Sequence, residues 1–461
     1  MAWEEKEWVC RQALSRQWIM DVLEKALEML SRYPLCDHCL GRQFAQLGYN
    51  MENNVRGQAI KISLTMQSND LVNENDDEGI KQLKVLATNG YSMEAQETLK
   101  HLKILQKYDK ETKCSLCEDK FKLVENLTVK ALQVIGDHEF TTFLVGIEMP
   151  AEIEEREDEF KARFNVSFGE SMRHEFGRIF GKAIAKATCK EADYLIPDLV
   201  IVINPFLEKT RLQINPLFIA GRYRKFLRDI PQSTWFCSNC RGKGCNKCGK
   251  TGKLYPESVE SLSSKLLIEA SRGHEVFFHA SGREDIDARM LGNGRPFVIE
   301  ISKPKKRFLN LMALEEEINA STVGKIEVSG LHFATKEVVR RLKKGENSQK
   351  EYALLAEFER DLTDKDLGII EKIFSEVTIK QQTPLRVVHR RADIVRERYI
   401  YKVKVKKVSL KRALLEIRCQ GGLYVKELVS GDEGRTIPNV SDSLGNPAKT
   451  LKLDVINVMM E

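Results

Sequence analysis

The chain has 461 residues, of which 42% are hydrophobic and 30% are charged, and its formal net charge is +6. This composition is typical of a soluble protein with a buried core, and the length suits two to four domains. No apolar run is long enough to span a membrane, and the acidic first residues lack the basic-then-apolar order of a signal peptide. We therefore expect a cytoplasmic protein, whose weak positive charge permits a nucleic-acid partner without requiring one.

Eight of the 11 cysteines form four Cys-x-x-Cys pairs, which are Cys36/Cys39, Cys114/Cys117, Cys237/Cys240 and Cys245/Cys248. An intracellular chain keeps its thiols reduced, so this spacing indicates metal binding and not disulfides. Two pairs together supply the four thiolates of a closed, tetrahedral structural zinc site. The first two pairs are far apart in the sequence but can meet in space. The last two pairs follow each other closely, and they either hold an ion of their own or share ligands with the first two.

The first part of the chain is predicted to be mostly helical. A stripe of apolar residues predicts a helix over 18–33, which ends before Pro34, and a second helix is expected over 93–108. Residues 66–79 are polar and acidic, and we interpret them as a flexible linker or insertion.

Strands and helices are mixed between residues 131 and 232. Strands are expected at 140–147, 194–205 and 209–215, and an amphipathic helix at 172–187. This order resembles the THUMP domain, an α/β RNA-binding module of RNA-modifying enzymes. The run that follows, Arg222 to Arg228, interleaves cations with Tyr223 and Phe226. It suits phosphate contact with Tyr223 stacked on a base, and it is equally compatible with a solvated surface.

The tandem of cysteine pairs lies in a basic, glycine-rich loop over residues 235–252. The cations are Arg241, Lys243, Lys247 and Lys250. Zinc is expected here, because four thiolates lie close together and glycines permit a tight backbone. The positive charge suggests that the loop also contacts RNA.

An alternation of acidic and basic residues, Gly282-Arg-Glu-Asp-Ile-Asp-Ala-Arg289, is followed by Leu291-Gly-Asn-Gly-Arg-Pro-Phe297 and by a predicted strand over 297–302. By composition alone this is a salt-bridged turn or an active-site loop. The two segments resemble the active-site loop of the archaeal and eukaryotic tRNA pseudouridine synthases that modify the TΨC arm. The resemblance implies that the catalytic carboxylate is Asp285 and not Asp287.

Two further segments resemble motifs of the TruB branch of pseudouridine synthases. Lys350-Glu-Tyr352 resembles a strand whose tyrosine stacks on the flipped uracil, and Gly421-Gly-Leu-Tyr424-Val-Lys426 resembles a Gly-Thr-Tyr-Ile-Arg motif. The resemblance assigns Tyr352, Tyr424 and Lys426 to substrate binding. Lysine replaces the arginine of that motif, so it offers a point charge without the bidentate fork. Lys426, with Arg283 as a second candidate, would keep Asp285 ionised.

The resemblance implies an enzyme that isomerises uridine to pseudouridine at position 55, and at position 54, of the TΨC arm of tRNA. Bond exchange needs no organic cofactor, and zinc would be structural. The family also implies one zinc held by Cys36, Cys39, Cys114 and Cys117. We expect a monomer that binds tRNA and no membrane. The alternative is a zinc-containing THUMP-type tRNA-binding protein without catalysis. A THUMP-containing methyltransferase or thiouridine synthase is disfavoured, because no nucleotide-binding glycine motif is present.

The expected fold is α+β, with a mixed β-sheet catalytic domain of the pseudouridine synthase type preceded by an α/β THUMP-like RNA-binding domain with structural zinc. The expected boundaries are 1–80 for a helical segment with the first cysteine pair and the acidic linker, 81–235 for the RNA-binding domain, 236–253 for a four-cysteine zinc knuckle, and 254–461 for the catalytic domain.

Overall fold

The computed structural model describes residues 22–104, 112–344 and 348–459. The chain divides into two compact units between Ile214 and Asn215, which we call the N-terminal unit and the C-terminal unit. Among the described residues, no helix has both the length and the apolar character needed to cross a membrane.

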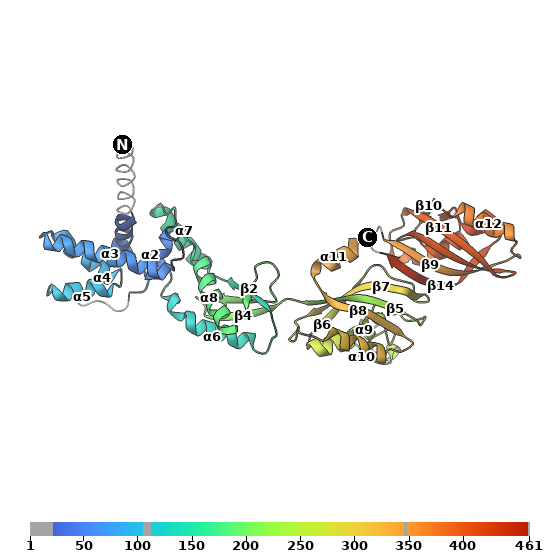
Figure 1. Ribbon diagram of the computed structural model, residues 1–461, viewed down its shortest axis with the longest axis horizontal. Helices are drawn as coiled ribbons and strands as arrows, with labels where there is room; N and C mark the ends of the chain where they lie inside the picture. The colour runs from blue at the N-terminus through green and yellow to red at the C-terminus, as the bar shows by residue number, and fades with distance from the viewer. Residues whose placement is uncertain (1–21, 105–111, 345–347, 460–461) are drawn as a thin grey trace, which may run out of the picture. The chain divides into compact units, whose positions relative to one another are not determined.

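The N-terminal unit begins with helices. Residues 22–32 are helical, and the start of the helix predicted over 18–33 falls on residues outside the described ranges. The helical elements that follow are α2 (Asp37–Gly41), η1 (Arg42–Phe44), α3 (Asn53–Asn73), α4 (Asp77–Thr88), α5 (Met93–His101), η2 (Lys120–Leu123) and α6 (Val124–Ile135) (Figure 1).

The flexible linker expected over residues 66–79 is wrong, because helices α3 and α4 occupy most of it. Asp76 caps α4 by accepting a hydrogen bond from the backbone N–H of Glu78. Gly79 lets the two helices approach closely, since a Cβ there would lie 2.5 Å from the carbonyl oxygen of Ser68. The composition of this segment favours disorder, but helix capping and close packing between the two helices stabilise a helical structure instead.

A four-stranded sheet completes the N-terminal unit. Its strands, in the order β2-β1-β3-β4, are β2 (Glu191–Ala192), β1 (Thr142–Ile147), β3 (Leu199–Asn204) and β4 (Lys209–Ile214). Strands β1 and β3 are parallel and β4 is antiparallel to β3. Helices α7 (Ala151–Arg163) and α8 (Met172–Thr188) lie between β1 and β2 in the chain, and Phe176, Phe180 and Ile184 of α8 belong to the same buried core as the β3 side chains. The predicted α/β arrangement is confirmed.

The C-terminal unit is built on a ten-stranded mixed sheet in the order β13-β10-β11-β12-β9-β14-β7-β5-β8, with β6 also paired to β7. The strands are β5 (Leu217–Lys225), β6 (Glu275–Ala280), β7 (Arg289–Ser302), β8 (Ile326–Ala334), β9 (Gln349–Phe358), β10 (Val377–Gln382), β11 (Val395–Ser409), β12 (Arg412–Gln420), β13 (Thr436–Ile437) and β14 (Ala448–Met459). Strand β14 lies between β9 and β7, so it joins the two halves of the sheet (Figure 1).

Helices cover the sheet on both sides of its β5–β8 half. Side chains Leu217 and Ile219 of β5 enter the core that contains Leu267 of α9 (Val259–Ser271) and Ile318 of α10 (Leu311–Ser321). The alternate residues Phe218 and Ala220 pack with α11 (Lys336–Lys344) on the other face. The remaining helical elements are η3 (Asn246–Cys248), α12 (Asp364–Ile373), η5 (Leu385–Arg390), α13 (Val425–Ser430) and α14 (Val440–Leu444).

The division between the units, at Ile214 and Asn215, comes earlier in the chain than residue 235, where the RNA-binding domain was expected to end. Strand β5 already belongs to the C-terminal unit. Its residues pair with β7 and β8 of the large sheet. The basic and aromatic run from Arg222 therefore continues a core strand, and the interpretation of Tyr223 as a base-stacking surface residue is wrong, because its side chain is fully buried.

Candidate active site

The loop between β6 and β7 carries Asp285. A network of buried polar side chains holds this loop in place. The Glu284 carboxylate accepts hydrogen bonds from Arg295 Nε at 3.0 Å and from the Tyr223 hydroxyl at 2.9 Å. Arg295 also donates to the Ser281 carbonyl at 2.7 Å. Each of these side chains is less than a tenth exposed. The alternating charges of the loop thus have a structural basis, because Glu284 points into the core and its neighbour Asp285 points away.

A buried lysine holds the backbone of the same loop. Lys225 Nζ donates to the carbonyl oxygens of Ile230 at 2.8 Å and Ile286 at 3.1 Å. Arg228 donates to the carbonyl oxygens of Asp287 at 2.7 Å and Leu453 at 2.8 Å. The loop is therefore tied to the end of β5 and to β14, which limits the freedom of the Asp285 side chain.

Two cations contact the Asp285 carboxylate. Lys426 Nζ and Arg386 Nη1 each lie 3.2 Å from Oδ2. Burial opposes ionisation, but the guanidinium of Arg386 and the ammonium of Lys426 outweigh it and hold the pKa of Asp285 below its ordinary value. About a third of the side chain remains exposed. Asp285 is thus a charged carboxylate that a ligand can reach.

The two cations also have partners of their own. Lys426 Nζ lies 2.7 Å from Asp287 Oδ2, and Arg386 Nε lies 2.5 Å from Oε1 of the buried Glu427. Glu427 thereby fixes the guanidinium that faces Asp285. Arg386 was not singled out from the sequence. A lone arginine 101 residues from its carboxylate gives no local signal.

Asp285 lies at a cavity of about 530 Å³ in the C-terminal unit. Tyr352, Tyr424 and Lys426 line the same cavity, so the structure brings together all four residues expected at the site. Tyr352 comes from the middle of β9, where it is paired with Ile417 of β12 and Val455 of β14. Burial raises the pKa of Tyr352, so its phenol stays protonated at neutral pH.

Tyr424 is positioned at the start of α13 by a buried glutamine. The Tyr424 backbone N–H donates to Gln381 Oε1 at 2.8 Å, and Gln381 Nε2 donates to the Tyr424 carbonyl at 3.0 Å. The Tyr424 hydroxyl accepts a hydrogen bond from Arg391 at 3.0 Å. Since Lys426 follows two residues later, the same contacts also hold the backbone from which its side chain projects.

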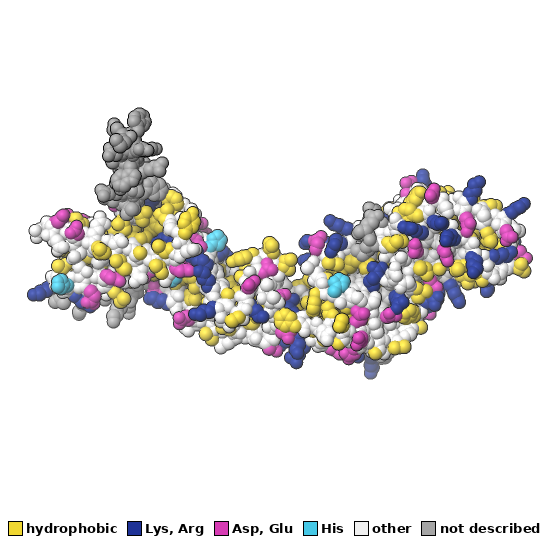
Figure 2. All heavy atoms as spheres, in the orientation of Figure 1, with side chains coloured by type: hydrophobic (Ala, Val, Ile, Leu, Met, Phe, Trp, Pro, Cys, Tyr) yellow, Lys and Arg dark blue, Asp and Glu magenta, His cyan; other side chains and the backbone are white. Residues whose placement is uncertain are grey.

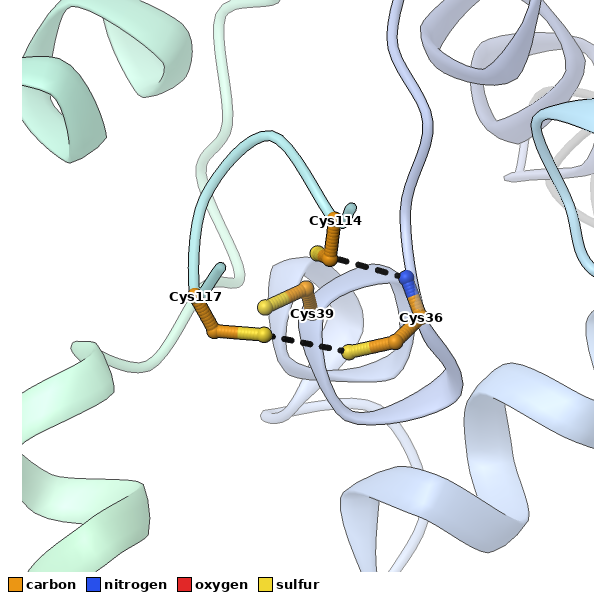
Figure 3. Close-up of side chains that lie close together, drawn as sticks. All are labelled: Cys36, Cys39, Cys114 and Cys117. Carbon is orange, nitrogen blue, oxygen red and sulfur yellow. Dashed lines mark hydrogen bonds between the residues drawn. The ribbon is translucent and has the colours of Figure 1, made fainter. Parts of the chain in front are cut away.

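The first two cysteine pairs meet in the N-terminal unit. Figure 3 shows the side chains of Cys36, Cys39, Cys114 and Cys117 directed toward one another. Cys36 Sγ and Cys117 Sγ are 3.5 Å apart, and the four sulfur atoms all lie within 4.8 Å of one another. Zinc–sulfur bonds of about 2.3 Å in a tetrahedron place the sulfurs about 3.8 Å apart. The donor set therefore fits a four-coordinate zinc ion.

The last two cysteine pairs form a second group in the C-terminal unit. Sulfur–sulfur distances are 3.9 Å for Cys237 and Cys245, 3.8 Å for Cys240 and Cys248, and 3.7 Å for Cys245 and Cys248. The backbone N–H of Gly252 donates to Cys248 Sγ, which favours the thiolate. This group also fits zinc. Each group contains four cysteines of its own. The last two pairs therefore do not share ligands with the first two pairs.

Comparison with known proteins identifies the family. The model described as "Pus10, C-terminal" matches residues 218–459, and "Pus10 THUMP domain, archaeal" matches residues 127–204. A protein named tRNA pseudouridine synthase Pus10 from Methanocaldococcus jannaschii is 43% identical over 94% of this chain and 93% of its own length. The protein of the same name from Thermofilum pendens is 37% identical over 96% of both chains.

The similarity to solved structures is weaker. A Cbf5-Nop10-Gar1 complex matches 51% of this chain and 49% of its own with 14% identity and a TM-score of 0.29, so the assignment rests on the sequence relatives. These relatives confirm the resemblance found in the sequence, including the THUMP domain. The chain belongs to the Pus10 family.

Proposed function

We propose that this chain isomerises uridine to pseudouridine at position 55, and at position 54, of the TΨC arm of tRNA, with Asp285 as the catalytic group. Its relatives are named tRNA pseudouridine synthases. The observation that carries the proposal is an ionised, accessible carboxylate at a cavity that is also lined by the partly buried Tyr352. All the proposed site residues come from one chain, so a monomer suffices. A tRNA substrate agrees with the cytoplasmic location expected from the sequence.

The reaction exchanges one bond of the nucleotide for another. The C1′–N1 bond of uridine breaks, the base turns, and a C1′–C5 bond forms. The target nucleotide must first leave its stack, as in other enzymes that act on bases. Asp285 can then act at C1′, at C6 of the base or on the C2′ proton, and each route begins with the ionised carboxylate. Tyr352 and Tyr424 hold the base in the cavity, and Lys426 keeps Asp285 charged.

Replacing Arg386 by methionine is expected to shift the acid limb of the pH–rate profile upward. The active form of Asp285 is ionised, so its activity is lost as pH falls through its lowered pKa. Removing one of the two cations leaves burial less opposed, and the pKa rises. Single-turnover rates from about pH 3 to pH 8, the range that contains the acid limb of a carboxylate with a lowered pKa, test this. Arg386→Lys retains a positive charge, so the acid limb of its profile should lie at nearly the same pH as that of the wild type. An acid limb at the same pH in all three proteins would contradict the role of Arg386.

We propose that each four-cysteine group binds a structural zinc ion, held by Cys36, Cys39, Cys114 and Cys117 in the N-terminal unit and by Cys237, Cys240, Cys245 and Cys248 in the C-terminal unit. Four sulfur ligands leave no open coordination position, so the metal would stabilise its surroundings without acting on the substrate.

The second cysteine group and its basic loop, residues 235–253, are proposed to contact tRNA phosphates. The loop carries five cations and no carboxylate, and a zinc tetrathiolate contributes −2, so the net charge is 5 − 2 = +3. The side chains of Lys243, Lys247 and Lys250 are exposed. Trp235, at the start of the loop, lines a second, smaller cavity together with Asp285. Other cations lie on the same unit, where Figure 2 shows Lys and Arg side chains spread over the β9–β14 strands.

Charge reversal of Lys243, Lys247 and Lys250 to glutamate is expected to weaken tRNA binding about tenfold or more at low salt. Each lost phosphate contact should reduce the slope of log affinity against log salt by about 0.7–0.9. Filter binding over a range of salt concentrations measures both. The matched control reverses three exposed lysines elsewhere on the unit, which are Lys365, Lys372 and Lys411. Identical slopes in the two triple variants would contradict a specific role of the loop.

Tritium release from tRNA labelled at C5 of uridine tests the proposed activity, because forming the C1′–C5 bond displaces the C5 hydrogen. The wild-type protein should release tritium from an unmodified elongator tRNA without added cofactor. Binding of the tRNA with no release would instead support the alternative of a THUMP-type binding protein without catalysis.

A further inference from the structure

Lys350 is a cation at the cavity that the proposed reaction has not used. It lies two residues before Tyr352 on β9, so both side chains project from the same face of the sheet. Both line the cavity that also contains Asp285. Within the described part of the chain, Lys350 Nζ has no hydrogen-bond acceptor and no carboxylate within ion-pair distance. The ammonium is therefore directed at the cavity without a counterion.

Two glycines lie beside the Lys350 side chain. A Cβ at Gly282, beside the Asp285 loop, would lie 2.9 Å from Lys350 Nζ. A Cβ at Gly421, before the turn that carries Tyr424, would lie 3.5 Å from Lys350 Cε. The lysine thus lies between the two segments that bear the proposed catalytic and binding residues. Its position is set by packing and not by an ion pair.

Charged and titratable groups surround Lys350 from every neighbouring element. They are His279 of β6, Arg283, Glu284 and Asp285 of the loop, Arg295 of β7, Lys343 of α11, Tyr352 of β9, Arg386 of η5, Arg391 after it, Cys419 of β12, and Tyr424 and Lys426 at α13. Burial and the Arg295 charge lower the pKa of Lys350 to about 8, while Cys419 and Glu284 act in the opposite direction. Glu284 is already bound to Arg295 and Tyr223. Lys350 is consequently charged at neutral pH yet poorly compensated, a state that an anion in the cavity would relieve.

The proposed reaction generates such an anion. When the C1′–N1 bond breaks heterolytically, its electron pair stays with N1, and the negative charge spreads over N1, O2 and O4 of the uracil. C5 then bonds to C1′, the C5 proton leaves and N1 gains a proton, so that atoms and electrons balance without a co-reactant. Lys426 and Arg386 are occupied by Asp285, Asp287 and Glu427. Lys350 has no such partner among the residues that the structure describes.

We propose that the Lys350 ammonium stabilises the detached uracil anion by donating a hydrogen bond to one of its ring oxygens. This inference rests on the proposed function. Lys350 keeps its protons throughout, and its contribution is largest when the base carries charge, after the glycosidic bond has begun to break. Such a donor lowers the barrier of the chemical step more than it strengthens substrate binding.

Lys350→Met is expected to reduce the single-turnover rate about 10²–10³-fold, the usual cost of removing one donor to a developing anion. The tRNA dissociation constant should stay within about twofold, because phosphate contacts dominate binding. Methionine matches the unbranched stem, and a thermal melt of each variant checks the fold. Lys350→Arg retains the charge, and its single-turnover rate should be at least tenfold higher than that of Lys350→Met. A Lys350→Met rate equal to that of the wild type, or a loss confined to tRNA binding, would overturn the proposal.

The pH dependence supplies a readout that a merely structural lysine would not change. The lysine assists only when protonated, so its contribution is present at neutral pH and is lost as pH rises through about 8. Above that pH the wild-type rate should fall relative to the rate of Lys350→Arg, because the guanidinium stays protonated over the same range. Titration of the substrate itself affects both proteins equally. Parallel falls in the two profiles would contradict the proposal. Pseudouridine formation by the wild type is measured in the same series, so failure of the proposed function itself would be seen as its absence there.

Discussion

Replacing Asp285 by asparagine is expected to abolish pseudouridine formation while leaving the fold and tRNA binding intact. The side chain keeps its shape but loses the charge that every proposed route requires. Loss of a group that reacts directly with substrate typically costs on the order of 10⁴-fold or more. Single-turnover tritium release at saturating enzyme measures the chemical step, and filter binding of the same tRNA measures affinity.

Asp287→Asn is the matched control for this variant. Asp287 lies in the same loop and binds the same lysine, but 61% of its side chain is exposed and it is not among the residues that line the larger cavity. Its replacement should change the rate by less than about tenfold. Equal release by Asp285→Asn and the wild type, or a larger loss in Asp287→Asn, would show that the wrong carboxylate has been assigned.

Removal of metal from the first cysteine group is expected to unfold the N-terminal unit. Cys39, Cys114 and Cys117 are almost completely buried and link α2 to the segment before η2. Apparent zinc-binding free energies of about 10–16 kcal/mol rival the whole stability of a domain, about 5–15 kcal/mol. Cys39→Ser should therefore lower the metal content from two zinc ions per chain to one and lose the thermal transition of this unit.

Native mass spectrometry and calorimetry measure the two effects. Cys189→Ser is the control, because Cys189 is exposed in the same unit and lies outside both cysteine groups. It should keep two zinc ions and the wild-type transition. One zinc per wild-type chain would contradict two independent sites, and an unchanged transition in Cys39→Ser would contradict a structural role.

The sequence predicted those cavity residues that lie in a recognisable motif. Asp285, Tyr352, Tyr424 and Lys426 lie in segments that resemble known motifs, and the structure brings them to one cavity. Arg386 had no such segment. Its place beside Asp285 depends on the tertiary fold and on the buried Glu427, which local sequence does not reveal.

The fold class was predictable, whereas two local interpretations failed for physical reasons. The alternation of Arg222, Tyr223 and Arg224 suggested a surface, but β5 is central in its half of the sheet and buries Tyr223 against the Glu284 network. The acidic residues around Asp76 suggested disorder, but they cap and flank two packed helices. In both cases a composition was compatible with two structures, and packing decided between them.

Mapping pseudouridine on a single unmodified tRNA transcript tests the central claim most directly. The transcript is incubated with the wild-type protein or with Asp285→Asn, treated with carbodiimide and alkali, and read by primer extension. We predict stops that report pseudouridine at positions 54 and 55 after incubation with the wild type and none after incubation with Asp285→Asn. No stop with the wild type, stops only outside the TΨC arm, or the same stops with both proteins would contradict the account.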